Sequence, residues 1–137
     1  MTKRTMTKWV KALRSGDYVQ TTSYLKCRNK DGELAHCCLG VLAEETGCRM
    51  QLIDLGYGGM EWFVAGESLL SPRQLKRLGM DERIQFKLAK MNDLGWSFKR
   101  IATFIEKNYT KFRTWDDGVL KNAKTFPEIA QYIKKTL

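Results

Sequence analysis

The segment from His36 to Ala43, with the sequence His-Cys-Cys-Leu-Gly-Val-Leu-Ala, constrains the fold of this chain more than any other stretch. It passes from a strand-like element directly into a helix whose side chains are almost all small and apolar. Such a helix has no polar face to turn toward water, so we expect it to be buried. A cysteine at a helix N-terminus is also placed where the helix dipole favours the thiolate.

Cys37 and Cys38 have two interpretations that differ in chemistry. Either one sulfur is a nucleophile or a redox-sensitive thiol, or both are small apolar groups that fit a crowded strand-to-helix junction. His36 is the single histidine of the chain, so no histidine distant in sequence can fold back as the base that a nucleophilic cysteine needs. We therefore favour structural cysteines. Because the chain also lacks a CxxC pair, we expect no zinc site and no cofactor.

Length and charge limit the classes of protein to consider. A chain of 137 residues is expected to form one domain, residues 1–137, with a hydrophobic core. No apolar stretch approaches the roughly 20 residues of a membrane-spanning helix, and no secretory signal follows the basic N-terminus, so we expect a cytoplasmic protein with reduced thiols. The net charge of +9 favours an anionic partner, although the cations are spread from Lys3 to Lys135.

Patterning in the N-terminal half predicts a helix, a strand pair and a second helix. Apolar residues at helical spacing predict a helix over 5–14. A stretch rich in Thr, Tyr and Val predicts a strand from Tyr18 to Cys27. A turn signal at 29–32 and a second strand over 33–37 would complete an antiparallel hairpin. The apolar helix then runs from Cys38 to Gly47.

The rest of the chain shows mainly helix signals. A third strand is predicted over 61–65, and Ser71-Pro72 with a glutamine three residues after the serine opens a short helix. Two further helices begin near Asp81 and after Ser97, residues 109–124 are expected to be irregular, and a final helix opens at Thr125. The sequence therefore predicts an α+β fold, mostly helical, with a small antiparallel sheet in the N-terminal half.

The predicted first strand offers a candidate ligand surface. Aromatic, amide and basic side chains alternate along one face of it, and an arginine precedes it. Aromatic rings can stack on a nucleobase, and basic groups can bind phosphate. The alternative is an ordinary exposed sheet face. The candidate ligand-binding residues on this surface are Arg14, Tyr18, Gln20, Tyr24 and Lys26.

Asn92 and Asp93 form a second candidate site at the end of a predicted helix. An acidic side chain opposes the helix dipole at that end, and a residue placed against local preference often has a specific role. One interpretation is that both side chains contact a ligand. The other is that they satisfy buried backbone groups near the helix that begins at Cys38.

Residues 88–108 resemble the first part of a helix-turn-helix, but the resemblance to that motif is flawed. Glu106 stands where the tight turn would need glycine. The candidate recognition segment carries two acidic residues and a glycine at 116–118, which are unfavourable in a helix that lies against phosphates. Paired core helices explain the pattern better.

Three stretches of the chain resemble a family of small uncharacterised bacteriophage proteins. The resemblance covers roughly residues 8–108, and its most specific parts are Cys-Cys-Leu-Gly-Val at 37–41 and Asn-Asp-x-Gly-x-Ser-Phe at 92–98. It implies a phage accessory protein made in the host cytoplasm. It carries over no catalytic residue, and it leaves residues 109–137 outside the match.

Three functions remain open at this level. The leading one is a non-enzymatic phage accessory protein that sequesters an anionic nucleotide-type ligand, or binds a host protein, and so counters host defence. The second is a small hydrolase of a cyclic nucleotide signal that uses Cys37 or Cys38, or Asp93 as a base. The third is a nucleic-acid-binding module with a degenerate helix-turn-helix and weak, nonspecific affinity. No membrane partner is expected, and the oligomeric state is not indicated.

Overall fold

The computed structural model describes residues 1–28, 31–50, 53–54, 64–65 and 69–112. The predicted turn residues 29–30 lie outside the described part of the chain, as do residues 61–63 of the predicted third strand. The acidic turn at 116–118 and the final helix from Thr125 lie outside it as well.

Five α-helices lie within the described ranges, and several of them begin or end at a recognisable signal. At α1, the Thr2 hydroxyl accepts the N–H of Thr5 at the start, and Gly16 adopts the left-handed conformation at the end. At α3, Ser71 and Gln74 form a reciprocal capping box. These helices match the sequence expectations. Their bounds are Lys3–Ser15 (α1), Cys38–Thr46 (α2), Pro72–Leu78 (α3), Glu82–Asp93 (α4) and Phe98–Asn108 (α5), and a 3₁₀ turn, Tyr109–Lys111 (η1), follows.

The sheet is small and mixed. Its strand order is β1-β3-β2-β5-β4. β1 runs parallel to β3, and the other described pairs are antiparallel, so the expectation of a purely antiparallel sheet is corrected while the α+β class is confirmed. The strands are Val19–Gln20 (β1), Lys26–Arg28 (β2), Leu34–His36 (β3), Ile53–Asp54 (β4) and Val64–Ala65 (β5).

The single strand predicted from Tyr18 to Cys27 is wrong, because the chain leaves the sheet in the middle of that stretch. Ser23 has a φ of 72°, a left-handed conformation that non-glycine residues rarely adopt. The side chain of Asp93 accepts its N–H at 3.0 Å, and the Thr21 carbonyl accepts a hydrogen bond from the Asn92 side chain. Hydrogen bonds from the end of α4 therefore override the local β preference of the sequence.

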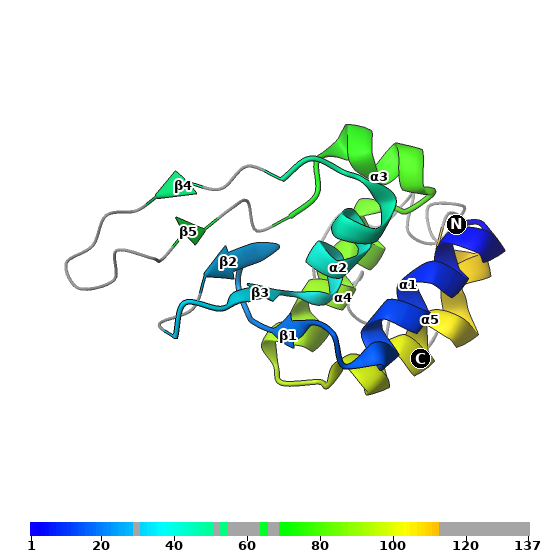
Figure 1. Cartoon of the computed structure of the whole chain (residues 1–137). Coiled ribbons are helices and arrows are strands. Elements are labelled where there is room, and N and C mark those ends of the chain that lie inside the picture. The colour runs from blue at the N-terminus through cyan, green and yellow to red at the C-terminus, as the bar shows by residue number, and fades with distance from the viewer. Residues whose placement is uncertain (29–30, 51–52, 55–63, 66–68, 113–137) are drawn as a thin grey trace.

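α2 lies at the centre of the molecule, as its apolar sequence predicts. Figure 1 shows the sheet on one side of α2, with α1 and α5 on the other and α4 behind it. Leu39, Leu42 and Ala43 of α2 are fully buried. Gly40 lies against the preceding loop, because a Cβ atom there would overlap the carbonyl oxygen of Leu25.

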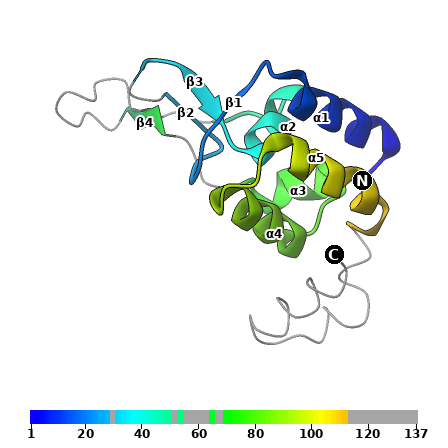
Figure 2. The ribbon, with the colours of Figure 1, turned by 90° about the horizontal axis from the view of Figure 1, so that it is seen from below.

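The remaining helices close the core around α2. α1 packs against both α2 and α5, and α4 packs against α2 and α5. Figure 2 shows α1 and α5 side by side, with α4 next to α5. Trp9 of α1 and Ile84 and Leu88 of α4 are fully buried in this core. None of the helices in the described ranges is long and apolar enough to span a membrane.

Candidate functional site

The start of α2 is held by three parts of the chain. Cys37 is the N-cap residue, and its side chain forms no capping hydrogen bond. Instead, the Oδ1 atom of Asn92 accepts the N–H of Cys38 at 3.1 Å. The indole of Trp9 donates to the Cys38 carbonyl at 2.8 Å, and the N–H of Cys37 reaches the carbonyl of Leu25 at 3.2 Å. A side chain from α4 thus performs the capping role that is usually local.

Asn92 uses its whole hydrogen-bonding capacity in this role. Besides Cys38, its Oδ1 accepts from Gln20 Nε2 at 3.0 Å. Its Nδ2 donates to the Thr21 carbonyl at 2.7 Å and to Asp93 Oδ1 at 3.4 Å. The residue is 1% exposed. An amide offers two donors and one oxygen with two lone pairs, so none remains for a ligand, and Asn92 serves buried backbone as the second interpretation proposes.

Asp93 lies beside Asn92 but is exposed. Its Oδ1 atom accepts the N–H of Ser23 at 3.0 Å, so it too fastens the loop between β1 and β2. Asp93 also borders a cavity of about 280 Å³ beneath that loop. Among the described residues, its lining includes Ser23, Cys37, Leu69, Ala89 and Asp93.

The thiols at the α2 start are protonated at neutral pH. Burial raises the pKa of Cys37 to about 11, against a smaller opposing effect of the backbone N–H groups of Gly40 and Leu39. Burial also raises the pKa of Cys38 well above its usual value. Because the thiolate is the nucleophile, this environment favours structural cysteines over a catalytic one.

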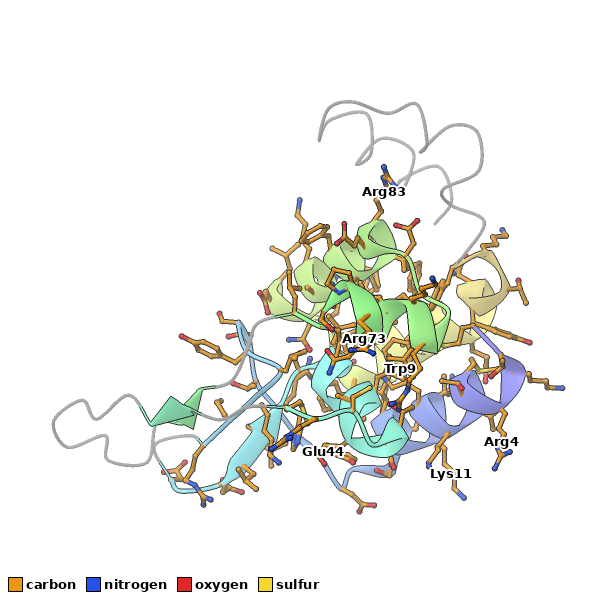
Figure 3. All side chains as sticks on the ribbon, turned by 90° about the horizontal axis from the view of Figure 1, so that it is seen from above. Arg4, Trp9, Lys11, Glu44, Arg73 and Arg83 are labelled. Carbon is orange, nitrogen blue, oxygen red and sulfur yellow. The ribbon has the colours of Figure 1, made fainter. Side chains whose placement is uncertain are left out.

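Tyr18 and Lys26 belong to a cluster around His36 that the sequence did not indicate. Glu44 Oε1 accepts from Lys26 Nζ at 2.7 Å and lies 3.2 Å from His36 Nε2. The ring of Tyr18 meets the His36 ring edge-on, with centroids 5.0 Å apart. Glu44 points toward the sheet (Figure 3). Its partners come from β2 and β3, so no periodic pattern in the sequence could have found it.

The residues of the candidate ligand surface do not lie together on one face of a strand. Gln20 is on β1 and Lys26 on β2, whereas Tyr18 and Tyr24 lie outside the strands. The amide of Gln20 donates to the Trp96 carbonyl at 2.7 Å as well as to Asn92. These residues do not share one face of a strand, because the predicted strand is broken at Ser23.

Arg14 lies on α1, apart from the sheet residues with which the sequence analysis grouped it. Its guanidinium pairs with Glu106 of α5, with Nη1 3.0 Å from Oε2, and Nη2 also reaches Thr103 Oγ1 at 3.4 Å. Both partners stay accessible, since the Arg14 side chain is 39% exposed and that of Glu106 is 51% exposed.

A groove of about 510 Å³ opens between α1 and α5 at this ion pair. Met6 and Val10 supply buried apolar side chains to it. Lys11 and Arg14 supply cations, and Glu106 supplies the carboxylate. Thr7 and Ser15 also line it within the described part of the chain. Lys11 was not among the residues predicted from the sequence, although its spacing from Arg14 along a helix places both on one face.

The outer face of α1 is strongly basic. The helix contains no acidic residue, and all of its cations are exposed. Figure 3 shows Arg4 and Lys11 pointing away from the body of the protein, while Trp9 points inward between the helices. The exposed cations of α1 are Lys3, Arg4, Lys8, Lys11 and Arg14.

Comparison with known proteins places the chain in a family without assigning it an activity. No curated protein and no solved structure matches it. Residues 1–77, which contain α1, the sheet, α2 and most of α3, match the family described as "Domain of unknown function (DUF8296)". That match spans more than half of the 137 residues, and the chain therefore belongs to this family.

Proposed function

We propose that the protein binds an anionic ligand of nucleotide type in the groove between α1 and α5, and that it sequesters this ligand rather than converting it. One observation carries the proposal. The groove combines buried apolar side chains, Met6 and Val10, with two cations, Lys11 and Arg14, on a helix that has no acidic residue.

The chemistry of the groove suits a nucleotide. Its volume of about 510 Å³ falls within the range of roughly 300–1,000 Å³ that is typical of small-molecule sites. The Met6 thioether is polarisable and favours contact with an aromatic base. Arg14 offers a planar guanidinium that binds phosphate through two parallel hydrogen bonds, and Lys11 adds a mobile positive charge.

Sequestration is favoured over hydrolysis because the candidate nucleophiles are protonated. The pKa of Cys37 is raised to about 11 by burial, and the Cys38 thiol is completely buried. Resemblance to bacteriophage proteins supplies a context for a binding protein: a phage accessory protein in the host cytoplasm that removes a host nucleotide signal, or that binds an acidic surface of a host protein.

Calorimetric titration with ADP-ribose, cyclic AMP and inorganic pyrophosphate tests this proposal. The double variant Lys11→Ala/Arg14→Ala should bind at least tenfold more weakly than wild type, since hydrogen bonds to charged groups contribute about 1.5–3 kcal/mol each and about 1.4 kcal/mol is a factor of ten. The matched control is Arg73→Ala/Lys76→Ala, which removes two exposed cations of α3.

Two results would contradict the proposal. Equal weakening in the two double variants would mean that overall charge, not the groove, attracts the ligand. Absence of binding to all three probes would favour a host protein as the partner.

A further inference from the structure

Glu106 occupies part of the groove in which the ligand is proposed to bind. Its two carboxylate oxygens lie 3.0 Å and 3.4 Å from the two terminal nitrogens of Arg14. The Arg14 side chain lowers the pKa of Glu106, so the carboxylate is ionised at neutral pH. The guanidinium edge that would hold a phosphate is thus already paired with an anion of the protein itself.

We propose that Glu106 is an internal competitor for Arg14, and that the groove takes diphosphate ligands, which gain Lys11 as a second cation when they displace Glu106. The inference rests on the proposed function of the groove, and it adds the class of ligand and the residue that the ligand must displace.

The preference for a diphosphate follows from the charges that are exchanged and from the contacts that are added. A phosphodiester with one negative charge only replaces the Glu106 carboxylate as the anionic partner of Arg14, so the exchange adds little binding free energy. A diphosphate carries further charge and spans a greater length. It can displace Glu106 and also contact Lys11, which lies three residues before Arg14 on the same helix face. The Arg14–Glu106 pair is half-exposed, and exposed pairs are weak, so displacement is feasible.

The test compares Glu106→Gln with wild type by calorimetry, using ADP-ribose as the diphosphate and cyclic AMP as the phosphodiester. Loss of the competitor should tighten ADP-ribose binding about two- to fivefold, the range expected for removing one exposed ion pair. Cyclic AMP should gain by at most the same factor, because the same ion pair no longer has to be broken, so the preference for ADP-ribose remains. Glu82→Gln, an exposed glutamate at the start of α4, is the matched control and should leave both affinities unchanged.

A double-mutant cycle separates competition from general repulsion. In an Arg14→Ala background, Glu106→Gln should have a clearly smaller effect, because no guanidinium remains to be released. Equal tightening in both backgrounds would overturn the inference, since Glu106 would then act only as a repelling charge. Unchanged affinity in Glu106→Gln would also overturn it while leaving the groove in place. Failure of wild type and all variants to bind either probe would defeat the proposed function as well.

Discussion

The amide of Asn92 satisfies groups on three separate segments from one buried position. It accepts the N–H of Cys38 at the start of α2 and the side-chain amide of Gln20 on β1, and it donates to the Thr21 carbonyl in the loop after β1. The local sequence suggested that this residue has a specific role. It did not show which role, because its partners lie 54 to 72 positions away along the chain.

Replacing Asn92 by alanine should lower the free energy of unfolding by about 2–4 kcal/mol, because the buried N–H of Cys38 and the partly buried carbonyl of Thr21 lose their partner. Urea denaturation of the purified variant measures this change. Asp93→Asn is the matched control: it keeps an oxygen for the Ser23 N–H on an exposed side chain and should cost less than about 1 kcal/mol. A loss below about 0.5 kcal/mol in Asn92→Ala would refute the capping role.

His36 should make stability depend on pH. Burial lowers its pKa from the ordinary value of 6.5, although Glu44 opposes this. The unfolded chain therefore takes up the proton more readily than the folded protein. The contribution of neutral His36 is fully present above pH 6.5 and is lost as the pH falls below that value toward the pKa of the folded state.

Unfolding free energies measured between pH 7.5 and 5 check this dependence. Glu44 cannot account for a change in that window: burial raises its pKa, but hydrogen bonds from Lys26 and His36 outweigh burial, and the pKa falls below 4.5. Its contribution is therefore lost only as the pH drops below that ordinary value. In His36→Gln the slope between pH 7 and 5 should flatten, and an unchanged slope would point to another group.

At the scale of elements, the helices could be predicted and the sheet only in part. Helix α3 has its capping box at Ser71, and α1 and α2 each end at a glycine. These signals are local, so they can be recognised in the sequence alone. The break in the first strand depends on hydrogen bonds from Asn92 and Asp93, which no local pattern reveals. The groove likewise depends on the packing of α5 beside α1. Arg14 could therefore be predicted from the sequence as a ligand-binding residue, but its pairing with Glu106 could not.

Because α2 closely approaches the loop at Leu25, we expect a single methyl group added at Gly40 to lower the stability of the protein severely. Gly40→Ala places a Cβ atom onto the Leu25 carbonyl oxygen, and a backbone atom cannot move as the end of a side chain can. We expect a loss of more than about 3 kcal/mol, beyond the usual range for overpacking, measured as the shift of the urea midpoint.

Gly16→Ala is the matched control for this prediction. Gly16 has a φ of 81° and open space where a Cβ would go, so this variant reports only the cost of a left-handed backbone, about 1–2 kcal/mol. Equal losses in Gly40→Ala and Gly16→Ala would show that steric overlap at α2 does not matter.

At the scale of the whole molecule, charge predicts a salt-sensitive affinity for nucleic acid. The cations of α1 form a continuous basic face, but the part of the helix-turn-helix that would read bases lies outside the described residues. We expect binding to a short DNA duplex at 50 mM salt that collapses by about 200 mM through counterion competition.

Fluorescence anisotropy at both salt concentrations provides the measurement. Arg4→Ala/Lys8→Ala, on the basic face of α1, should lower the steepness of the salt dependence more than Arg73→Ala/Lys76→Ala on α3. A sequence-selective complex that survives 200 mM salt would instead support a dedicated DNA-binding protein.

The capping of α2 by Asn92 also sets the order in which the chain can fold during synthesis. The first turn of α2 is made early, but the amide that completes it follows 54 residues later. A nascent chain that ends at residue 77, where the family match stops, holds the central helix without its cap and without α4 and α5 to cover it. We therefore expect the ribosome-bound N-terminal portion to stay open until α4 emerges, and the exposed apolar helix to be the segment that a chaperone would bind in that interval.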